Sequence, residues 1–291
     1  MAPDRTTTNV QIALPKGRMQ DNIFKLLADA GINVRLDSRG YRPTLSVPGF
    51  EAKVLKPQNI VEMLDLGTRD IGFAGADWVA ELEADLVDLL DTRLDPVKIV
   101  VAAPTSILER GKLPKRKLVF ASEYERLAKK WIKDNAIDAT FVRSYGATEV
   151  FPPDDADCIV DNTATGSTLR ANNLEIIDTV MESSTRLFAS KRALDDRQRR
   201  DTIEHFVLLL RSVLEARARV MLELNVPANK LEAVVAILPC MREPTVAKLH
   251  GDAGYAVKSA VPSEGLPILI GKIKQAGGSD IVVSSLSQIV P

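Results

Sequence analysis

The chain has 291 residues, of which 45% are hydrophobic and 26% charged, and its formal net charge is −1. This length allows substantial cores and predicts two or three domains. With 38 basic against 39 acidic residues and only 5% aromatic residues, the composition argues against a nucleic-acid partner. No apolar run reaches about 18 residues, so neither a transmembrane helix nor a membrane partner is expected.

The sequence contains few residues of the types that bind transition metals or form disulfides. The two cysteines, Cys158 and Cys240, and the two histidines, His205 and His250, lack the spacing of a metal site or a disulfide framework. Cys158 lies in an apolar stretch, as expected of a core residue in a reducing compartment. Residues 1–9 are polar and contain no apolar signal-peptide core. We therefore expect a cytoplasmic protein with no metal centre built from side chains.

Strands and helices alternate through the first two thirds of the sequence. Apolar runs predict strands at 10–14, 44–47, 53–55, 71–74, 98–103, 117–121, 139–142, 158–160 and 186–190. Apolar stripes at helical spacing predict helices over 23–30, 58–66, 78–84, 123–135 and 203–214. This alternation is typical of an open α/β sheet with largely parallel strands. We expect two lobes with a ligand cleft between them, residues 1–98 completed by 183–218, and residues 99–182.

The pattern changes after the long predicted helix. Strands are predicted at 220–226, 245–249, 255–261 and 280–285, with one helix after Pro227 and another over 264–276. This βαββαβ order is typical of a ferredoxin-like domain. We expect residues 219–291 to form a separate domain of this kind.

The most informative segment follows the predicted strand at 158–160. Asp161 ends the strand, and a loop of small residues from Thr163 to Thr168 leads into a predicted helix. Gly166 lets the backbone approach a ligand, and the loop's N–H groups, its hydroxyls and the helix N-terminus favour a phosphate monoester. Asp161 would repel a phosphate but suits a neighbouring hydroxylated group such as a ribose. Capping residues at a strand–turn–helix connection are the simpler explanation, but four hydroxyl residues around one glycine exceed that need.

Two other loops at strand ends carry polar residues. Lys16 and Arg18 flank Gly17 in a turn between a strand and a helix, where α/β sheets bind ligands. Two cations in that place suit a polyphosphate, although an exposed basic turn explains them equally well. Glu149 follows the next glycine-containing loop, where it either caps a helix or accepts hydrogen bonds from ribose hydroxyls together with Asp161.

The segment 161–169 resembles the 5-phosphoribosyl-1-pyrophosphate (PRPP) loop of phosphoribosyltransferases. With the segments 12–18, 55–60, 70–77 and 145–149, it resembles the ATP phosphoribosyltransferase family across nearly the whole chain. Segments 222–227 and 243–246 are similar to the regulatory domain of that family's long, self-regulated form. The resemblance implies a two-lobed catalytic region like that of periplasmic binding proteins, followed by a ferredoxin-like regulatory domain. It also implies the first step of histidine biosynthesis, in which N1 of ATP displaces pyrophosphate from PRPP and gives phosphoribosyl-ATP.

The resemblance also assigns roles to residues. The 5-phosphate of PRPP would be held by Thr163, Ala164, Thr165, Gly166, Ser167 and Thr168, and the ribose hydroxyls by Asp161 and Glu149. ATP or diphosphate would contact Lys16, Gly17, Arg18, Lys56, Gly75 and Asp77. The catalytic residues would be Asp161, Glu149, Lys16 and Arg18. Mg²⁺ would bind through the substrate diphosphate rather than through a protein cage.

The sequence departs from the family pattern at two places. Lys56 begins a Lys-Pro-Gln-Asn segment where the family often has Arg-Pro-x-Asp, and a lysine lacks the bidentate fork of an arginine. Asn162 stands where the family usually has an apolar residue. Neither departure removes the donors of the 163–168 loop.

Three other interpretations stay open from the sequence. The loop alone does not name the acceptor, so a phosphoribosyltransferase for a free base is one. A solute-binding protein with two α/β lobes is another, although such proteins usually carry a secretory signal. The third is a catalytically silent regulatory homologue. For the ATP enzyme, the resemblance further implies inhibition by histidine and a homo-hexamer built from dimers.

Overall fold

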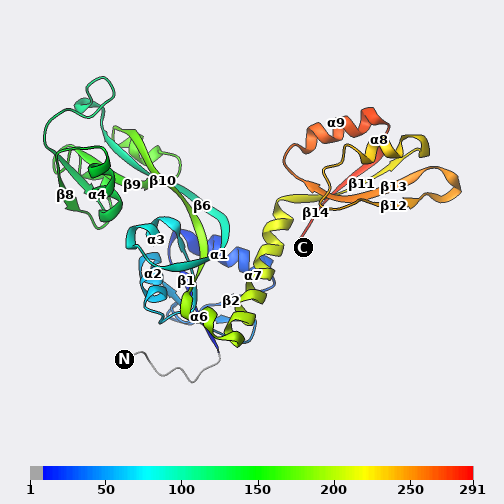
Figure 1. Cartoon of the computed structure of the whole chain (residues 1–291), viewed down its shortest axis with the longest axis horizontal. Coiled ribbons are helices and arrows are strands. Elements are labelled where there is room, and N and C mark those ends of the chain that lie inside the picture. The colour runs from blue at the N-terminus through cyan, green and yellow to red at the C-terminus, as the bar shows by residue number, and fades with distance from the viewer. Residues whose placement is uncertain (1–8, 291) are drawn as a thin grey trace. The chain divides into compact units, whose positions relative to one another are not determined.

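The computed structural model describes residues 9–290, which form two compact units (Figure 1). Residues 9–25 and 32–204 make the first unit, and residues 26–31 and 205–290 make the second. The expectation of a polar N-terminal tail concerns residues that lie almost entirely outside the described range. Among the described residues, no helix is long and apolar enough to cross a membrane.

The first unit is built on one eight-stranded sheet in the order β4-β1-β5-β10-β6-β9-β7-β8. Three parallel strands form its first half-sheet: β1 (Val10–Pro15), β4 (Phe50–Leu55) and β5 (Ile71–Gly75). Three more parallel strands form its second half-sheet: β7 (Leu118–Ser122), β8 (Ala139–Arg143) and β9 (Cys158–Thr163). The predicted α/β class is thus confirmed.

Two long strands join the half-sheets and pair with each other in antiparallel fashion. Strand β6 (Leu86–Pro104) and strand β10 (Leu174–Ser190) run side by side along nearly their whole lengths (Figure 1). The sequence indicated only 98–103 and 186–190. The remaining parts are rich in charged residues that face solvent, such as Asp91 and Glu175, and these interrupt the apolar pattern of a strand. Such strands resist prediction because pairing, not burial, holds them.

Helices cover the half-sheets. All the predicted helices are present, but the first and the last begin five to six residues before the predicted residues 23 and 203, and the short helix at Lys191–Asp195 was not predicted. The helices are α1 (Arg18–Asp29), α2 (Pro57–Asp65), α3 (Ala76–Leu82), α4 (Glu125–Asp134), α5 (Ser167–Ala171), α6 (Lys191–Asp195) and α7 (Arg197–Arg217). Pro57 opens α2 at the first turn, where its missing N–H costs nothing. A hairpin of β2 (Val34–Arg35) and β3 (Thr44–Leu45) and two 3₁₀ turns, Thr105–Ile107 and Thr148–Val150, complete the unit.

Each half-sheet packs its own core. On the first, Ile60, Val61 and Leu64 of α2 are fully buried with Ala13 of β1. On the second, Phe120 and Cys158 lie in one cluster with the start of α4. Burial raises the pKa of the Cys158 thiol to about 12, so this cysteine is the inert core residue that was predicted.

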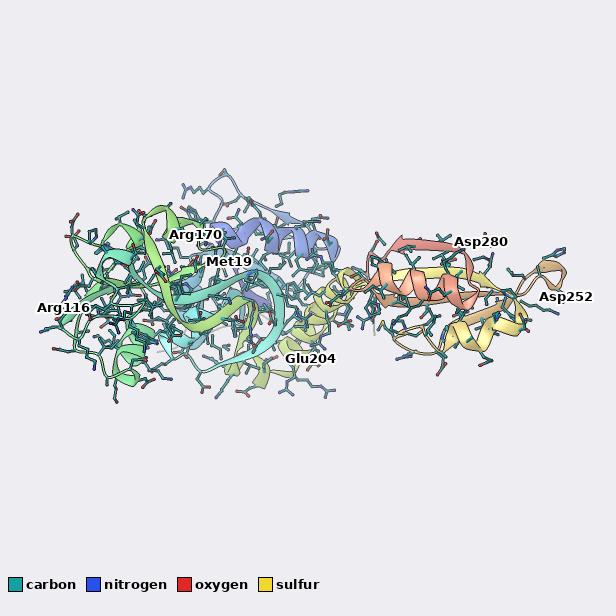
Figure 2. All side chains as sticks on the ribbon, turned by 90° about the horizontal axis from the view of Figure 1, so that it is seen from above. Met19, Arg116, Arg170, Glu204, Asp252 and Asp280 are labelled. Carbon is teal, nitrogen blue, oxygen red and sulfur yellow. The ribbon has the colours of Figure 1, made fainter. Side chains whose placement is uncertain are left out.

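The second unit has the predicted βαββαβ order. Its elements are β11 (Arg219–Val226), α8 (Leu231–Val235), β12 (Thr245–Lys248), β13 (Tyr255–Pro262), α9 (Leu266–Ala276) and β14 (Ser279–Ser285), with 3₁₀ turns at Ala228–Lys230 and His250–Asp252. The strands pair as β12-β13-β11-β14, all antiparallel. Asp252, in the second of these 3₁₀ turns, and Asp280, near the start of β14, carry exposed side chains (Figure 2).

The division between the units runs through α7 rather than after it. Arg217 of α7 forms an ion pair with Asp29 (Nη2–Oδ2, 2.8 Å), and the Ile289 N–H donates to the Ser212 carbonyl. These contacts join the C-terminal part of α7 to residues 26–31 and to the end of the chain. The second unit therefore contains more than the 219–291 segment that was expected.

Candidate functional site

The first part of the site lies where the strands of the first half-sheet end. Parallel register sets Pro15 beside Leu55, so the next residues, Lys16 and Lys56, follow neighbouring strands at the same edge. The Lys16 ammonium donates to the Tyr41 hydroxyl (3.3 Å) and lies 4.9 Å from the centre of that ring. Strand β5 ends at the same edge with Gly75. Two cations and a glycine turn thus meet at one edge of the sheet.

The second part lies at the carboxyl ends of β7, β8 and β9. Ser122 of β7 is in register with Val160 of β9 and with Arg143 of β8, so Asp161 lies level with Glu123, just past the end of β7. Asp161 does not end its own strand as predicted, because β9 continues to Thr163 and Asp161 pairs with Val100 of β6. Burial raises the pKa of Asp161 to about 6, and the negative charges of Glu149 and Glu123 add to the effect. An acidic edge on the second half-sheet thus contrasts with the basic edge on the first.

One oxygen of Asp161 is held by its neighbour and the other is not. The Oδ1 atom accepts from the Asn162 backbone N–H (2.7 Å) and from Asn162 Nδ2 (3.3 Å). Within residues 9–290, no hydrogen bond reaches Oδ2. Asp161 is half-buried, and a carboxylate with one unpaired oxygen can accept a hydrogen bond from a ligand hydroxyl.

The loop that follows Asp161 is preorganised by its own hydroxyls. Gly166 has a φ of +73°, and its N–H donates to Thr163 Oγ1 (2.9 Å). The Thr165 and Ser167 hydroxyls are 3.0 Å apart and are exposed, as is Thr168. The predicted helix after the loop exists, but α5 has only five residues. A phosphate at this loop would therefore be held by hydroxyl and N–H donors, with little help from a helix dipole.

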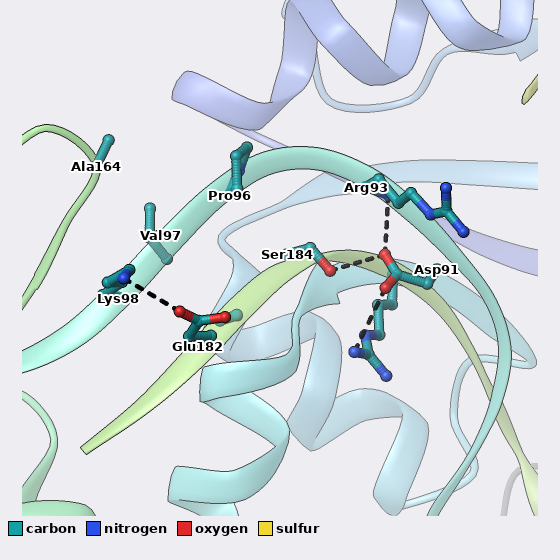
Figure 3. Close-up of a pocket in the computed structure, with 10 residues that line it drawn as sticks. Asp91, Arg93, Pro96, Val97, Lys98, Ala164, Glu182 and Ser184 are labelled. Atoms are coloured by element: carbon teal, nitrogen blue, oxygen red, sulfur yellow. Dashed lines mark hydrogen bonds and ion pairs between the residues drawn. The ribbon is translucent and has the colours of Figure 1, made fainter. Parts of the chain in front are cut away.

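Two adjoining cavities are lined by residues of the basic edge and by two close neighbours of Asp161. The first, of about 130 Å³, is lined by Lys16, Arg18, Met19, Pro57, Gly75, Asp77, Trp78, Asp95, Val97, Tyr124, Asn162, Ser183 and Ser184. The second, of about 370 Å³, shares Val97, Ser183 and Ser184 and adds Asp91, Arg93, Pro96, Lys98, Ala164, Glu182 and Arg186 (Figure 3). Hereafter, the two together are called the cleft.

The structure gathers some of the predicted site residues in the cleft and leaves others beside it. Lys16, Arg18, Gly75, Asp77 and Ala164 line it. Gly17, Lys56, Glu149, Asp161, Thr163, Thr165, Gly166, Ser167 and Thr168 do not line either cavity. Nevertheless, Asn162 and Ala164 do, and these flank Thr163. The 161–168 segment therefore reaches the cleft at two of its residues.

Asp77 is fixed by the protein rather than left open to a ligand. Its Oδ1 accepts from Ser183 Oγ (2.6 Å) and its Oδ2 accepts from the Tyr124 hydroxyl (2.7 Å). Its own N–H donates to Ser183 Oγ (3.0 Å), and the residue is only 5% exposed. In this state the Asp77 carboxylate shapes the wall of the cleft.

Several residues of the cleft carry no signal in the sequence. Tyr124, Ser183 and Ser184 reach it only because β7 and β10 pass there. The segment around Arg93 gives a weak signal: Arg93 and Asp95 both have positive φ, and a polar Asp-Thr-Arg-Leu-Asp-Pro run in a strand is unusual. Arg93 carries the one cationic group of the larger cavity for which the described residues provide no ion pair, since Lys98 pairs with Glu182 and Arg186 with Asp88.

No group of three histidine, cysteine, aspartate or glutamate side chains suited to hold a metal ion occurs among residues 9–290. The cleft therefore offers separate carboxylates and cations rather than a cage. A divalent cation would need further oxygen ligands from a substrate or from water.

Comparison with known proteins gives the family. The model of the ATP phosphoribosyltransferase family matches residues 56–212, more than half of the chain. The chain belongs to the ATP phosphoribosyltransferase family. The model described as "HisG, C-terminal domain" matches residues 216–288. The family expected from the sequence is thus confirmed.

Relatives of this ATP phosphoribosyltransferase family agree along the whole chain. The enzyme of Chlorobium phaeobacteroides is 35% identical over 292 aligned positions, covering 99% of this chain and 99% of that protein. The enzyme of Pelotomaculum thermopropionicum is 35% identical, covering 97% and 99%. A chain of the solved ATP phosphoribosyl transferase (HisG:HisZ) complex from Thermotoga maritima superposes with a TM-score of 0.63 at 25% identity. That chain is covered to 98%, but only 71% of this chain is matched, so this chain is the longer one.

Proposed function

We propose that the cleft is the active site of an ATP phosphoribosyltransferase. Family membership gives the reaction: the phosphoribosyl group of PRPP passes to N1 of ATP, pyrophosphate leaves, and the product enters histidine biosynthesis. The observation that carries the assignment to this cleft is its pair of opposed edges. Cations of the first half-sheet meet the Asp161 segment of the second half-sheet across a space that both line.

PRPP binds at the second half-sheet in this proposal. The donors of residues 163–168 hold the 5-phosphate, which the loop supports through exposed hydroxyls and the left-handed Gly166. Asp161 and Glu149 accept hydrogen bonds from the ribose hydroxyls. The unpaired Asp161 Oδ2 and the nearness of Glu149, apparent in the pKa of Asp161, support these roles.

ATP and the diphosphate bind at the first half-sheet. Lys16, Gly17, Arg18 and Lys56 contact these phosphates, and Gly75 lies near the nucleotide. Asp77 takes the supporting role that its hydrogen bonds indicate. The described residues provide no ion pair for Lys16, Arg18 or Lys56, so the negative charge of phosphate groups would favour binding at this edge.

The chemistry needs positioning and electrostatic stabilisation more than a covalent intermediate. The transition state has oxocarbenium character, so positive charge develops on the ribose while negative charge grows on the leaving diphosphate. An ionised Asp161 near the ribose stabilises the first charge, and Lys16 and Arg18 stabilise the second. N1 of ATP carries no proton, so no general base is required.

Mg²⁺ is the cofactor in this proposal, and it arrives on the diphosphate. When bound, it would neutralise charge on the leaving group. Oxygen ligands suit the ion, and the diphosphate and water would supply them.

An ultraviolet difference assay with ATP, PRPP and magnesium tests this function. We expect phosphoribosyl-ATP to form, and free purine or pyrimidine bases in place of ATP to give no product. Product with a free base and none with ATP would instead identify a different phosphoribosyltransferase. No PRPP binding at all would remove the assignment of the 163–168 loop.

We further propose a division of roles in which the C-terminal region regulates the catalytic region. In this proposal the catalytic region has two lobes like those of periplasmic binding proteins, residues up to 98 completed by 183–218, and residues 99–182. The ferredoxin-like C-terminal region from residue 219 binds histidine and regulates the enzyme, which acts as a cytoplasmic homo-hexamer built from dimers. The Thermotoga protein was solved together with HisZ, whereas this chain has a C-terminal HisG domain of its own. Suppression of product formation by L-histidine but not by D-histidine would support this role, and no suppression would remove it.

A further inference from the structure

A series of hydrogen bonds runs from Asp77, at the end of the first half-sheet, to Asp161, and Tyr124 lies at its centre. On one side, the Tyr124 hydroxyl donates to Asp77 Oδ2 at 2.7 Å. On the other, it accepts from Asn162 Nδ2 at 3.3 Å. The same amide group and the Asn162 backbone N–H both donate to Asp161 Oδ1. Tyr124 is only 1% exposed, so its bond to Asp77 is shielded from water, whereas the bonds of Asn162 are partly buried.

Tyr124 itself has little freedom to move. Its ring stacks on Trp78 with centroids 4.7 Å apart, and its N–H donates to Ser122 Oγ (2.8 Å). The helix that it precedes, α4, has no cap from its own N-cap residue; instead, Glu81 of α3 accepts from the N–H groups of Arg126 and Leu127, each at 3.0 Å. The start of α4 is therefore fixed against α3, and the hydroxyl of Tyr124 is fixed with it.

The protonation of this hydroxyl is also fixed. Burial and the neighbouring Asp77 charge raise the pKa of Tyr124 far above its ordinary value of 10.0. The hydroxyl has one proton, which goes to the ionised Asp77, and its oxygen is left to accept from Asn162. The charge of Asp77 thus sets which group donates in each hydrogen bond: the Asn162 amide donates to Tyr124, and Tyr124 donates to Asp77.

We propose that Tyr124 is a positioning residue for PRPP binding, acting through Asn162 to hold Asp161 with its free oxygen toward the ribose. This inference rests on the proposed ribose-binding role of Asp161. It also gives a purpose to Asn162, because an apolar residue at that position has no amide to link Tyr124 with Asp161. Tyr124 does not need to touch substrate in this role.

Tyr124→Phe and Asn162→Leu test the proposal, since each removes one polar group and keeps the approximate shape. Each should raise the KM for PRPP up to about tenfold, the scale of one lost hydrogen bond, and change the KM for ATP less than about twofold. Tyr255→Phe in β13 is the matched control, because the described residues give its hydroxyl no hydrogen bond; it should leave both KM values unchanged. Equal increases for both substrates in Tyr124→Phe would indicate general loosening and overturn the proposal.

The double variant Tyr124→Phe/Asn162→Leu tests whether Tyr124 acts through Asn162 or independently of it. If Tyr124 acts through Asn162, Tyr124→Phe in the Asn162→Leu background should add almost nothing, and the total loss should stay near that of Asn162→Leu alone. A loss near the product of the two single losses would show independent effects and refute the pathway. If Tyr124→Phe does not fold, Asn162→Leu alone decides: an unchanged KM for PRPP overturns the inference.

Failure of the proposed function gives a different pattern. If the unaltered protein binds PRPP in a calorimetric titration but forms no phosphoribosyl-ATP, the proposed reaction fails, and the Kd for PRPP replaces KM in the same comparisons. If the unaltered protein does not bind PRPP, the ribose site and this inference fail together.

Discussion

Asp161→Asn should make the protein more stable and almost inactive. The carboxyl group has a pKa of about 6 in the folded protein against an ordinary 3.8, chiefly because it is buried. The folded protein thus holds this proton more tightly than the unfolded chain, so ionisation of Asp161 costs stability. The cost is absent below about pH 3.8, reaches about half near pH 5 and is complete above pH 6. At 1.36 kcal/mol for each pKa unit, it amounts to at most about 3 kcal/mol.

Asparagine removes this cost because it has the same shape, never ionises and still accepts from Asn162. Both tryptophans, Trp78 and Trp131, lie in the first unit, so thermal unfolding followed by tryptophan fluorescence reports on that unit. Removing 3 kcal/mol would raise the melting temperature by at most about 6–12 °C at pH 8, and by about half as much at pH 5. Turnover should fall at least about a hundredfold, as for the loss of one electrostatic stabiliser.

Asp157→Asn is the control with the opposite sign. A hydrogen bond from Arg116 lowers the pKa of Asp157, so its ionised form stabilises the fold wherever the pH exceeds about 3.8. Loss of that carboxylate should lower the melting temperature by a similar amount at pH 5 and pH 8. The reasoning fails if Asp161→Asn lowers the melting temperature at pH 8, or if its effect does not change between the two pH values.

Three further predictions concern the same loop and carboxylate. In the unaltered enzyme, kcat/KM for PRPP should fall about tenfold for each pH unit below about 6, because Asp161 must be ionised; a pH–rate profile that is flat down to pH 5 would contradict this. Thr168→Val should raise the KM for PRPP about tenfold in steady-state kinetics, and an increase confined to ATP would show that the loop is misassigned. Gly166→Ala should cost roughly 1–2 kcal/mol, measured by thermal unfolding, because φ is +73° and the new Cβ would lie 2.9 Å from Arg170 Nη1; unchanged stability would mean that the loop relaxes freely.

The fold was largely predictable where buried side chains recur in the sequence as apolar runs or at regular spacing. The parallel strands and the C-terminal βαββαβ order follow from apolar runs such as that ending at Val160. The joining strands were not predictable over their full lengths, because charged residues such as Glu182 line a ribbon that faces solvent. Helix α8 ends at Val235, although apolar residues at helical spacing continue to Leu238. Pro239 follows directly, and a proline disfavours helical backbone at the residue before it.

The candidate site was predictable where chemistry is concentrated in a short segment. The Asp161 loop and the Lys16 turn are visible as local patterns of charge, glycine and hydroxyl groups. Tyr124 and Ser183 are not, because their role depends on contacts with Asp77, which is 47 and 106 residues away in the sequence. Asp77 was expected near the nucleotide, and only coordinates reveal that its carboxylate is already occupied.

The return of β10 to the first half-sheet has a consequence for the order of folding during synthesis. Strand β5 pairs with β10 through contacts such as Ile71 with Ala189, so one edge of β5 stays open until more than a hundred further residues have been made. The second half-sheet is complete in sequence before that, and can fold as an insertion while the first waits. Contacts over such sequence distances slow folding and leave a strand edge exposed to wrong partners. A nascent chain of which only residues before 185 have emerged from the ribosome should therefore carry a folded second half-sheet and an incomplete first half-sheet.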